Sequence, residues 1–182
     1  NKLENLEKAL TVYKELVRVA GQRFPTNELT AAAMGELGNC AAQLQDYATA
    51  TNAYQQALLF PGASGTIRSQ ARVGLAIVLE KQATPAGAPV GTELLKQARE
   101  LYRDVYQGKF LSPDEVLEAF WKKKAGLEAA RLSELLSEWP QAIELYRDLN
   151  RQKLLSASEL ELKVAGVERR KRATERSDGT AI

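Results

Sequence analysis

An alanine followed four positions later by a tyrosine occurs at four places in this chain, each within a segment of helical periodicity. The four pairs are Ala9 and Tyr13, Ala50 and Tyr54, Ala98 and Tyr102, and Ala142 and Tyr146. Residues four apart share one face of an α-helix, so each pair places a small and a large side chain on the same packing surface. Such recurrence predicts an internal repeat.

Glycines alternate with these pairs along the chain, at Gly38, Gly74, Gly126 and Gly166. A glycine inside a helix costs about 1 kcal/mol relative to alanine, so four at matched places indicate a packing requirement. Two antiparallel helices approach closely where one of them lacks a side chain. The expected repeat-packing residues are therefore the four glycines together with Ala50, Tyr54, Ala98, Tyr102, Ala142 and Tyr146.

Apolar residues spaced three and four apart predict helices over nearly the whole chain, and no β-strand pattern persists. We expect one solenoid unit that begins with a second-helix half repeat and ends with a capping helix. Its expected parts are 1–26 (half repeat), 28–64, 66–110 and 113–153 (helix pairs), and 156–176 (capping helix).

Local signals refine these boundaries. Residues 83–92 hold two prolines and two glycines, which predicts an inserted loop within the second helix pair. Ser112, Pro113 and Glu115 predict the start of a helix. Serine caps the first turn, proline is favoured inside that turn, and a glutamate three residues after the serine completes a capping box. The tail from Ser177 is expected to fray.

Composition excludes several kinds of chemistry. The chain has no histidine, which removes imidazole bases and histidine metal ligands. Its single cysteine, Cys40, cannot form an internal disulfide or a multi-cysteine metal site, and we expect it to be a buried apolar residue. We expect no catalytic residue, no metal site, no cofactor and no small-molecule substrate. A net charge of +2 favours no class of partner.

The alternation of helices resembles the tetratricopeptide repeat, most closely over residues 31–61. The residues that carry the resemblance there are Leu37 and Gly38, Asp46 and Tyr47, Ala50, Tyr54, Ala57 and Pro61. The later pairs retain Gly74, Ala98 and Tyr102, and then Gly126, Trp139, Ala142 and Tyr146. The resemblance implies an all-α, right-handed solenoid of antiparallel helix pairs, with about eight helices.

A second recurrence points to a cellular setting. Phe24-Pro25-Thr26 and Phe60-Pro61-Gly62 each follow a tyrosine-bearing helix and precede an alanine-rich one. This arrangement resembles the repeats of bacterial cell-envelope proteins. It implies a periplasmic or envelope-associated location rather than a cytoplasmic one.

The resemblance also implies a function. In such solenoids the first helix of each pair lines a concave groove, and we expect a non-enzymatic scaffold that binds a partner's peptide or helix there. The residues expected to line the groove are Asn39, Gln43, Arg68, Ala71, Leu75, Val78, Phe120, Lys123, Leu127 and Arg131. The groove is expected to be partly apolar with basic margins, which suits an amphipathic helix or an extended peptide with acidic flanks.

Two other functions remain open at this point. The half repeat at 1–26 has an apolar stripe but no preceding helix to pack against it. This favours a self-assembly module, which would form a homo-oligomer through this half repeat, or a subunit of a larger complex. The basic residues 169–172 and the lysines beside Trp121 suggest nucleic acid, but solvated helix faces explain them better.

Overall fold

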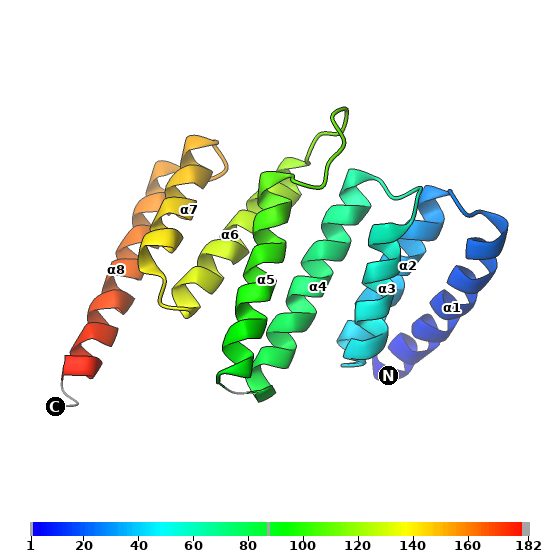
Figure 1. The fold of residues 1–182 in the computed structure, drawn as a ribbon, viewed down its shortest axis with the longest axis horizontal. Helices are drawn as coiled ribbons and strands as arrows, with labels where there is room; N and C mark the ends of the chain where they lie inside the picture. The colour runs from blue at the N-terminus through cyan, green and yellow to red at the C-terminus, as the bar shows by residue number, and fades with distance from the viewer. Residues whose placement is uncertain (1, 87, 180–182) are drawn as a thin grey trace.

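The computed structural model describes residues 2–86 and 88–179. Within them the chain forms eight α-helices and no strand. The helices are α1 (Lys2–Arg23), α2 (Glu28–Gln43), α3 (Tyr47–Leu59), α4 (Gly65–Ala86), α5 (Val90–Gln107), α6 (Ala119–Leu135), α7 (Trp139–Arg151) and α8 (Ala157–Gly179). They stand side by side in a row with α1 and α8 at opposite ends (Figure 1). The predicted all-α solenoid of antiparallel helix pairs is confirmed.

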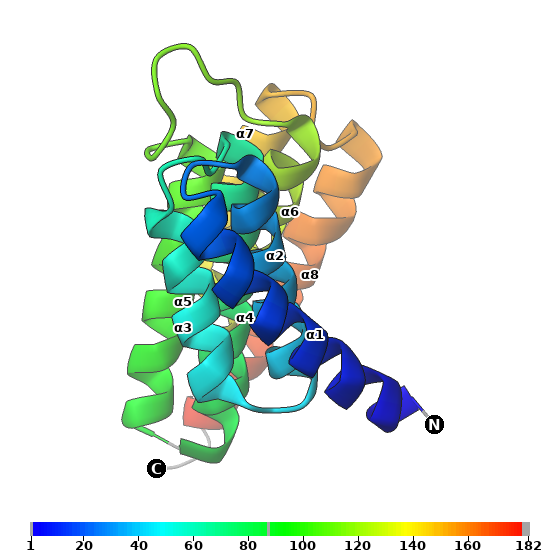
Figure 2. The ribbon, with the colours of Figure 1, turned by 90° about the vertical axis from the view of Figure 1, so that its right-hand side faces the viewer.

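The helices are arranged in two layers. Seen along the row, α2, α4, α6 and α8 lie on one side and α3, α5 and α7 on the other (Figure 2). We call them the first-helix layer and the second-helix layer. Successive helices pack against each other throughout, and α4 also contacts α2 and α6 within its own layer. Each pair is therefore buried mainly by its neighbours, as in other solenoids.

The recurring alanines and tyrosines form the core between these layers. Ala50, Ala98 and Ala142 are fully buried, which confirms their predicted packing role. Tyr102 and Tyr146 belong to one hydrophobic cluster and are almost completely inaccessible to solvent. Tyr54 occupies the same kind of place in a second cluster nearer the N-terminus.

Three of the four predicted glycine contacts are confirmed. A Cβ on Gly38 would lie 2.6 Å from the Tyr54 ring, and one on Gly74 would meet the same ring. Gly126 lies against Leu149, where a Cβ would come within 2.7 Å. The prediction for Gly166 is wrong, because only its own helix neighbour Arg170 lies nearby, 3.5 Å from where a Cβ would be.

The predicted loop at 83–92 is also wrong, because α4 continues to Ala86 and α5 begins at Val90. A Cβ on Gly91 would lie 2.5 Å from the carbonyl oxygen of Ala83, so the two helices cross closely here. This glycine serves helix contact, and both helices must extend to reach the crossing. Gly87, at the centre of the predicted loop, lies outside the described residues.

The predicted helix start at Ser112 is a further error, because α6 begins only at Ala119. Part of the capping geometry is present, since the Ser112 backbone N–H donates to the Glu115 carboxylate over 2.8 Å. The helix does not continue from there, and the preceding α5 ends at Gln107 and is capped by Gly108 in the left-handed region (φ 64°).

Residues 109–118 instead form a loop, the α5–α6 loop, that lies on the beginning of α4. Its Glu115 pairs with Arg68 of α4. The Arg72 guanidinium, also on α4, sits 4.0 Å from the centre of the Phe110 ring. These contacts hold the α5–α6 loop against α4 of the preceding helix pair. Because the loop is held there, a helix does not begin at Ser112.

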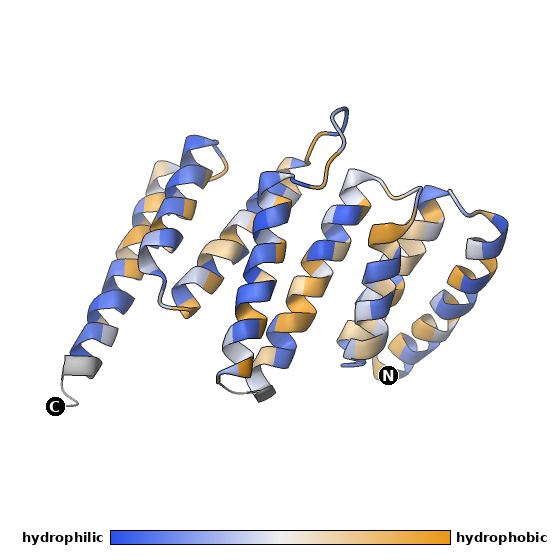
Figure 3. Ribbon diagram, viewed as in Figure 1, coloured by the Kyte–Doolittle hydropathy of each residue, from blue (hydrophilic) through white to orange (hydrophobic). Residues whose placement is uncertain are grey.

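The C-terminal helix begins as predicted and ends later. Ser156 and Glu159 form a full capping box, with each backbone N–H donating to the other side chain over 2.8 Å and 3.2 Å. The helix extends to Gly179, past the predicted frayed start at Ser177, and Thr180–Ile182 lie outside the described residues. Its C-terminal half is mainly hydrophilic, as expected of a cap (Figure 3). None of the described helices is long and apolar enough to cross a membrane.

Candidate functional site: a groove along the first-helix layer

Three hollows follow one another along the first-helix layer. They lie between α2 and α4 (about 310 Å³), between α4 and α6 (about 410 Å³), and between α6 and α8 (about 750 Å³). The first two share Ile77 and Lys81, and the last two share Glu128, Arg131 and Leu135. The shared walls make one continuous groove, which we call the first-helix groove.

The groove has an apolar lining that solvent reaches. Leu135 is 60% exposed and Ile77 is 38% exposed, although both are large hydrophobic residues. Half-buried Leu127 and Trp139 add to this surface in the widest hollow, where both also pack against the core. Exposed apolar residues gathered in a concave surface are typical of a binding site.

Buried tyrosines of the second-helix layer reach polar residues of the first-helix layer. The Tyr102 hydroxyl donates to Glu80 over 2.8 Å, and the Tyr146 hydroxyl donates to Glu134 over 2.6 Å. The Tyr54 hydroxyl donates to Asn39 over 2.7 Å in the same way. The bonds to Glu80 and Glu134 fix two carboxylates of the groove, because the tyrosine in each bond is anchored in the core.

Two of the side chains that accept a tyrosine hydrogen bond, Glu80 and Glu134, also pair with an arginine of the following first helix. Arg131 of α6 pairs with Glu80 of α4, and Arg170 of α8 pairs with Glu134 of α6. Arg131 also pairs with Glu128 over 2.6 Å. Glu80 and Glu134 thus each join their own helix pair to the next helix along the groove, whereas the Glu128 pair lies within α6.

Burial shifts the acidity of the tyrosines involved. It raises the pKa of Tyr54 to about 12, with the Glu36 charge adding to the shift. Burial first, and then the nearby Glu80 charge, raises the pKa of Tyr102 well above its usual range. The pKa of Tyr146 rises for the same reasons, with Glu134 as the neighbour. All three hydroxyls therefore remain donors at neutral pH.

Three lysines line the groove without forming an ion pair with any described residue: Lys81, Lys124 and Lys163. They come from α4, α6 and α8 in turn. In all, five basic side chains and three carboxylates line the groove, and each carboxylate is paired with an arginine. The positive charge that remains free is therefore carried by lysine.

Three of the predicted groove residues lie in the groove, and two are core residues. Gln43, Leu127 and Arg131 line it as expected. Ala71 is fully buried and does not face it, so that prediction is wrong. Val78 forms the base of the α2–α4 hollow but is only 1% exposed, so its side chain belongs to the core.

The other predicted groove residues make contacts elsewhere and line none of the hollows. Asn39 accepts the Tyr54 hydrogen bond, and Arg68 holds the α5–α6 loop. Leu75 packs against the core, Phe120 is exposed at the start of α6, and Lys123 lies 3.8 Å from Glu159.

The sequence prediction chose the wrong face of α4. Besides Val78 at its base, the side chains of α4 that line the groove are Ile77, Glu80, Lys81 and Thr84. They lie in the C-terminal half of the helix, and only Thr84 falls within the expected loop at 83–92. The polar pair Glu80 and Lys81, directly after an apolar run, was the available signal for a surface there.

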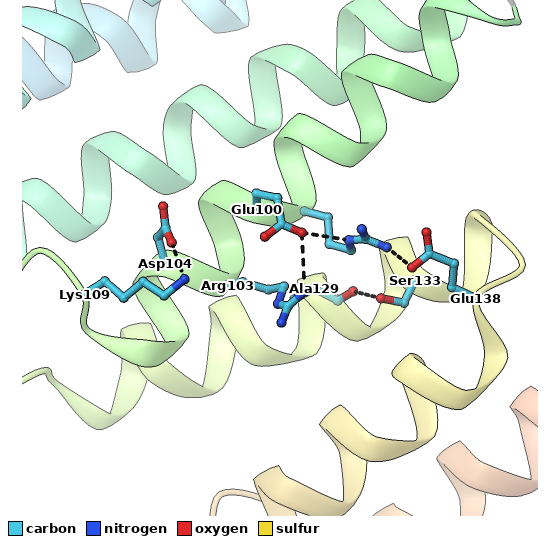
Figure 4. Close-up of polar contacts among 8 residues, drawn as sticks. Glu100, Arg103, Asp104, Lys109, Ala129, Ser133 and Glu138 are labelled. Carbon is cyan, nitrogen blue, oxygen red and sulfur yellow. Dashed lines mark hydrogen bonds and ion pairs between the residues drawn. The ribbon is translucent and has the colours of Figure 1, made fainter.

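A separate hollow of about 440 Å³ opens on the second-helix layer between α5 and α7. Its α5 wall carries Arg103, which is 3.4 Å from Glu100, and its base includes Ser133, whose hydroxyl donates to the Ala129 carbonyl (Figure 4). Its α7 wall carries the carboxylates Glu144 and Asp148. Because one wall carries basic and the other acidic side chains, the charge of this hollow favours neither an anionic nor a cationic ligand.

The described residues hold no cluster of three or more acidic or cysteine side chains that would suit a metal ion. Cys40 is buried, and burial raises the pKa of its thiol. A buried thiol with a raised pKa is a poor nucleophile at neutral pH. The predicted packing role of Cys40 agrees with this placement.

Comparison with known proteins identifies the repeat. Residues 1–58 match the family model of the tetratricopeptide repeat. Searches among curated proteins and among solved structures return no match. The matched residues comprise α1, α2 and nearly all of α3, and the same alternation of helices continues to α8. Residues 1–58 are therefore a match to the tetratricopeptide repeat, and the helix pairs that follow share its all-α architecture.

Proposed function

We propose that this chain is a non-enzymatic scaffold that binds a peptide segment of a partner protein in the first-helix groove. Tetratricopeptide repeats are in general protein–protein interaction modules, which supports the class of function. The observation that carries the proposal is the continuity of the groove, because adjacent hollows share lining residues along three consecutive helix pairs.

The chemistry of the groove supports a peptide rather than a small molecule. The hollows extend across four first helices, and their lining combines exposed apolar side chains with lysines. A partner segment with apolar residues for Leu135 and Ile77 and with acidic residues for the lysines would match both features.

Selection from a random peptide display library tests the proposal. We expect the selected peptides to combine apolar and acidic residues and to bind the purified chain in a fluorescence anisotropy assay. Leu135→Glu and Ile77→Glu should each weaken binding at least several-fold, because each places a negative charge on the apolar lining. Leu59→Glu is the matched control, since Leu59 is 83% exposed on α3 and lines none of the hollows.

A result against the proposal would be selected peptides whose binding is unaffected by Leu135→Glu and Ile77→Glu. Circular dichroism melting curves of the variants separate loss of the groove from loss of the fold. Both residues are exposed enough that the folded state should persist.

A second candidate function is self-assembly through α1. The observation in its favour is the exposure of Val12 (65%) and Leu16 (46%), which lie four apart on one face of this helix. If a second copy covers this face, sedimentation velocity will show a dimer that Leu16→Lys converts to monomer. Leu162→Lys on α8 is the control, because Leu162 is also exposed but lies at the other end of the row.

A further inference from the structure

One position of the repeat is buried in every helix that carries the alanine–tyrosine pair, except in α1. The residue three positions after the tyrosine is Ala57 in α3, Val105 in α5 and Leu149 in α7, and all three are fully buried. The corresponding residue of α1 is Leu16, which is 46% exposed. Leu16 therefore occupies a core position of the repeat without the neighbour that buries the other three.

That neighbour is a glycine of the paired first helix where α6 packs against α7. A Cβ on Gly126 of α6 would come within 2.7 Å of the Leu149 side chain of α7. Because glycine has no side chain, the two helices approach closely at this point. A helix that buries Leu16 in the same way needs a glycine at the corresponding place.

Gly166 of α8 is the glycine of the repeat pattern that lacks such a contact. Among the described residues only Arg170 of its own helix lies near the place of its Cβ. Leu162, four positions earlier, is 76% exposed, and Ala165 is exposed as well. At the opposite end of the row from α1, α8 thus presents an open glycine with apolar side chains beside it (Figure 1).

The lengths of the two terminal helices agree with a pair between them. With Gly166 opposite Leu16 in an antiparallel pair, residues 167–179 of α8 would run beside residues 2–15 of α1. The shorter parts, before Gly166 and after Leu16, would lie together in the same way. The two helices would therefore overlap over nearly their whole length.

Charges on the second-helix layer agree with the same pairing. Arg103 of α5 and Asp148 of α7 line facing walls of the α5–α7 hollow. Counted from the repeat alanine of each helix, the corresponding residues are Arg147 in α7 and Glu15 in α1. Arg147 is exposed and forms no ion pair among the described residues, while Glu15 has only an exposed pair with Arg18, which contributes little. An α1 helix placed beside α7 would therefore bring a carboxylate to an unpaired arginine.

We propose that copies of this chain assemble head to tail, with α1 of one copy packed against α8 and α7 of the next. The α8 and α1 helices then form a helix pair shared by two molecules, in which Gly166 receives Leu16. This inference rests on the second candidate function, self-assembly, and names the surface that covers α1. A second copy is the occupant because the two open faces match in glycine position, helix length and charge.

Such a contact repeats, because every assembled pair of copies still has an open α1 at one end and an open α8 at the other. Heterologous contacts of this kind form open chains or rings rather than closed dimers. Sedimentation velocity of the purified chain over a range of concentrations should show a mass that rises beyond that of two copies.

Lysine substitutions on each face test the two halves of the contact. Leu16→Lys and Leu162→Lys should each give monomers, because each places a charge on one of the two apolar faces. Leu59→Lys is the matched control, since Leu59 is exposed on α3 and lies on neither face. It should assemble like the unaltered chain.

Mixing the two variants shows which faces meet. The Leu16→Lys chain keeps an intact α8, and the Leu162→Lys chain keeps an intact α1. An equimolar mixture should therefore form a dimer of one copy of each and grow no further. A symmetrical contact between two α1 helices predicts instead that the Leu162→Lys chain dimerises alone and gains nothing from the mixture.

Gly166→Leu separates assembly from folding. The melting temperature of the monomer should stay the same or rise, because leucine favours a helix more than glycine does and the site is open. Assembly should be lost, because the new side chain takes the place of Leu16.

Several results would overturn the inference. They are an unaltered chain that stays monomeric at every concentration, a mixture of the two lysine variants that stays monomeric, and a Gly166→Leu chain that still assembles. If the Leu162→Lys chain dimerises and the Leu16→Lys chain does not, the head-to-tail contact is wrong and self-assembly through α1 stands. Peptide binding in the first-helix groove is measured separately and does not depend on these outcomes.

Discussion

The hydroxyl of Tyr102 donates a hydrogen bond of 2.8 Å to the carboxylate of Glu80, from the buried second-helix layer to the rim of the groove. Tyr102 is 1% exposed, so the carboxylate that it holds is fixed relative to the core. Arg131 of the following pair binds the same carboxylate. The Glu80 side chain therefore lines the groove, bonds to a core tyrosine and pairs with an arginine of the next helix pair.

Tyr102→Phe should lower the free energy of unfolding by about 1–2 kcal/mol. The ring stays in the core, but Glu80 loses a hydrogen bond to its charged oxygen, and such bonds contribute about that much. Urea denaturation measures the change. Tyr13→Phe is the control, because no hydrogen bond of Tyr13 occurs among the described residues; equal losses in the two variants would contradict this account of Glu80.

Gly38→Ala and Gly74→Ala should each destabilise the fold, by about 1–3 kcal/mol. The Tyr54 ring lies against both glycines, so it cannot move away from a new methyl group on one without meeting the other. Alanine's better helix propensity, worth about 1 kcal/mol, does not offset this clash.

Gly21→Ala is the control for the glycine variants. Nothing lies within 4 Å of a Cβ at Gly21, so the same change there should stabilise α1 by about 0.5–1 kcal/mol. Thermal unfolding followed by circular dichroism separates the two cases. A stabilising effect at Gly38 would show that this glycine does not mark a helix contact.

Stability should fall at alkaline pH because of the buried tyrosines. The pKa of Tyr54 is raised to about 12 in the folded chain, and burial raises those of Tyr102 and Tyr146 further, whereas an unfolded tyrosine titrates near about 10. A raised folded pKa contributes stability that is complete below the unfolded pKa. That contribution is therefore lost as the pH rises from about 10 towards 12 and beyond.

Urea midpoints measured from neutral pH to strongly alkaline pH test this dependence, with tyrosinate absorbance followed in parallel. Tyr54→Phe should flatten part of the slope. If the native chain ionises all its tyrosines near pH 10 without losing stability, the burial argument fails.

Glu115→Gln should loosen the α5–α6 loop while leaving the helices intact. The backbone N–H of Ser112 and the charge of Arg68 together hold the pKa of Glu115 below its usual range, so the charged form is the one that holds the loop. Hydrogen exchange with mass spectrometry should show faster exchange in residues 109–118 and unchanged exchange in α2. Unchanged exchange in the loop would mean that Glu115 does not fasten it.

The sequence predicted the repeat well because its signals are local and repeated. Ala50, Ala98 and Ala142 each share a helix face with a tyrosine four residues later, and burial of the pair follows from helix geometry alone. Gly166 repeats the same sequence pattern, but within the described residues only Arg170 of its own helix lies near the place of its Cβ. The pattern alone does not reveal whether a neighbouring helix packs against the glycine.

The groove was harder to predict because it depends on how far each helix extends and how it is rotated. Gly91 suggested a loop, yet it marks a close crossing with Ala83 that lets α4 continue. The continued helix presents Thr84 to the groove beside Lys81, whereas the expected Ala71 is buried. Long-range contacts of this kind have no counterpart in local spacing.

Nuclear magnetic resonance mapping of a library-selected peptide on the isotope-labelled chain tests the central claim most directly. The account predicts that backbone amide shifts change along the first-helix groove, around Ile77, Lys81, Leu135 and Lys163, and leave α3 unchanged. Shifts confined to the α5–α7 hollow around Arg103, or to the exposed face of α1, would contradict it.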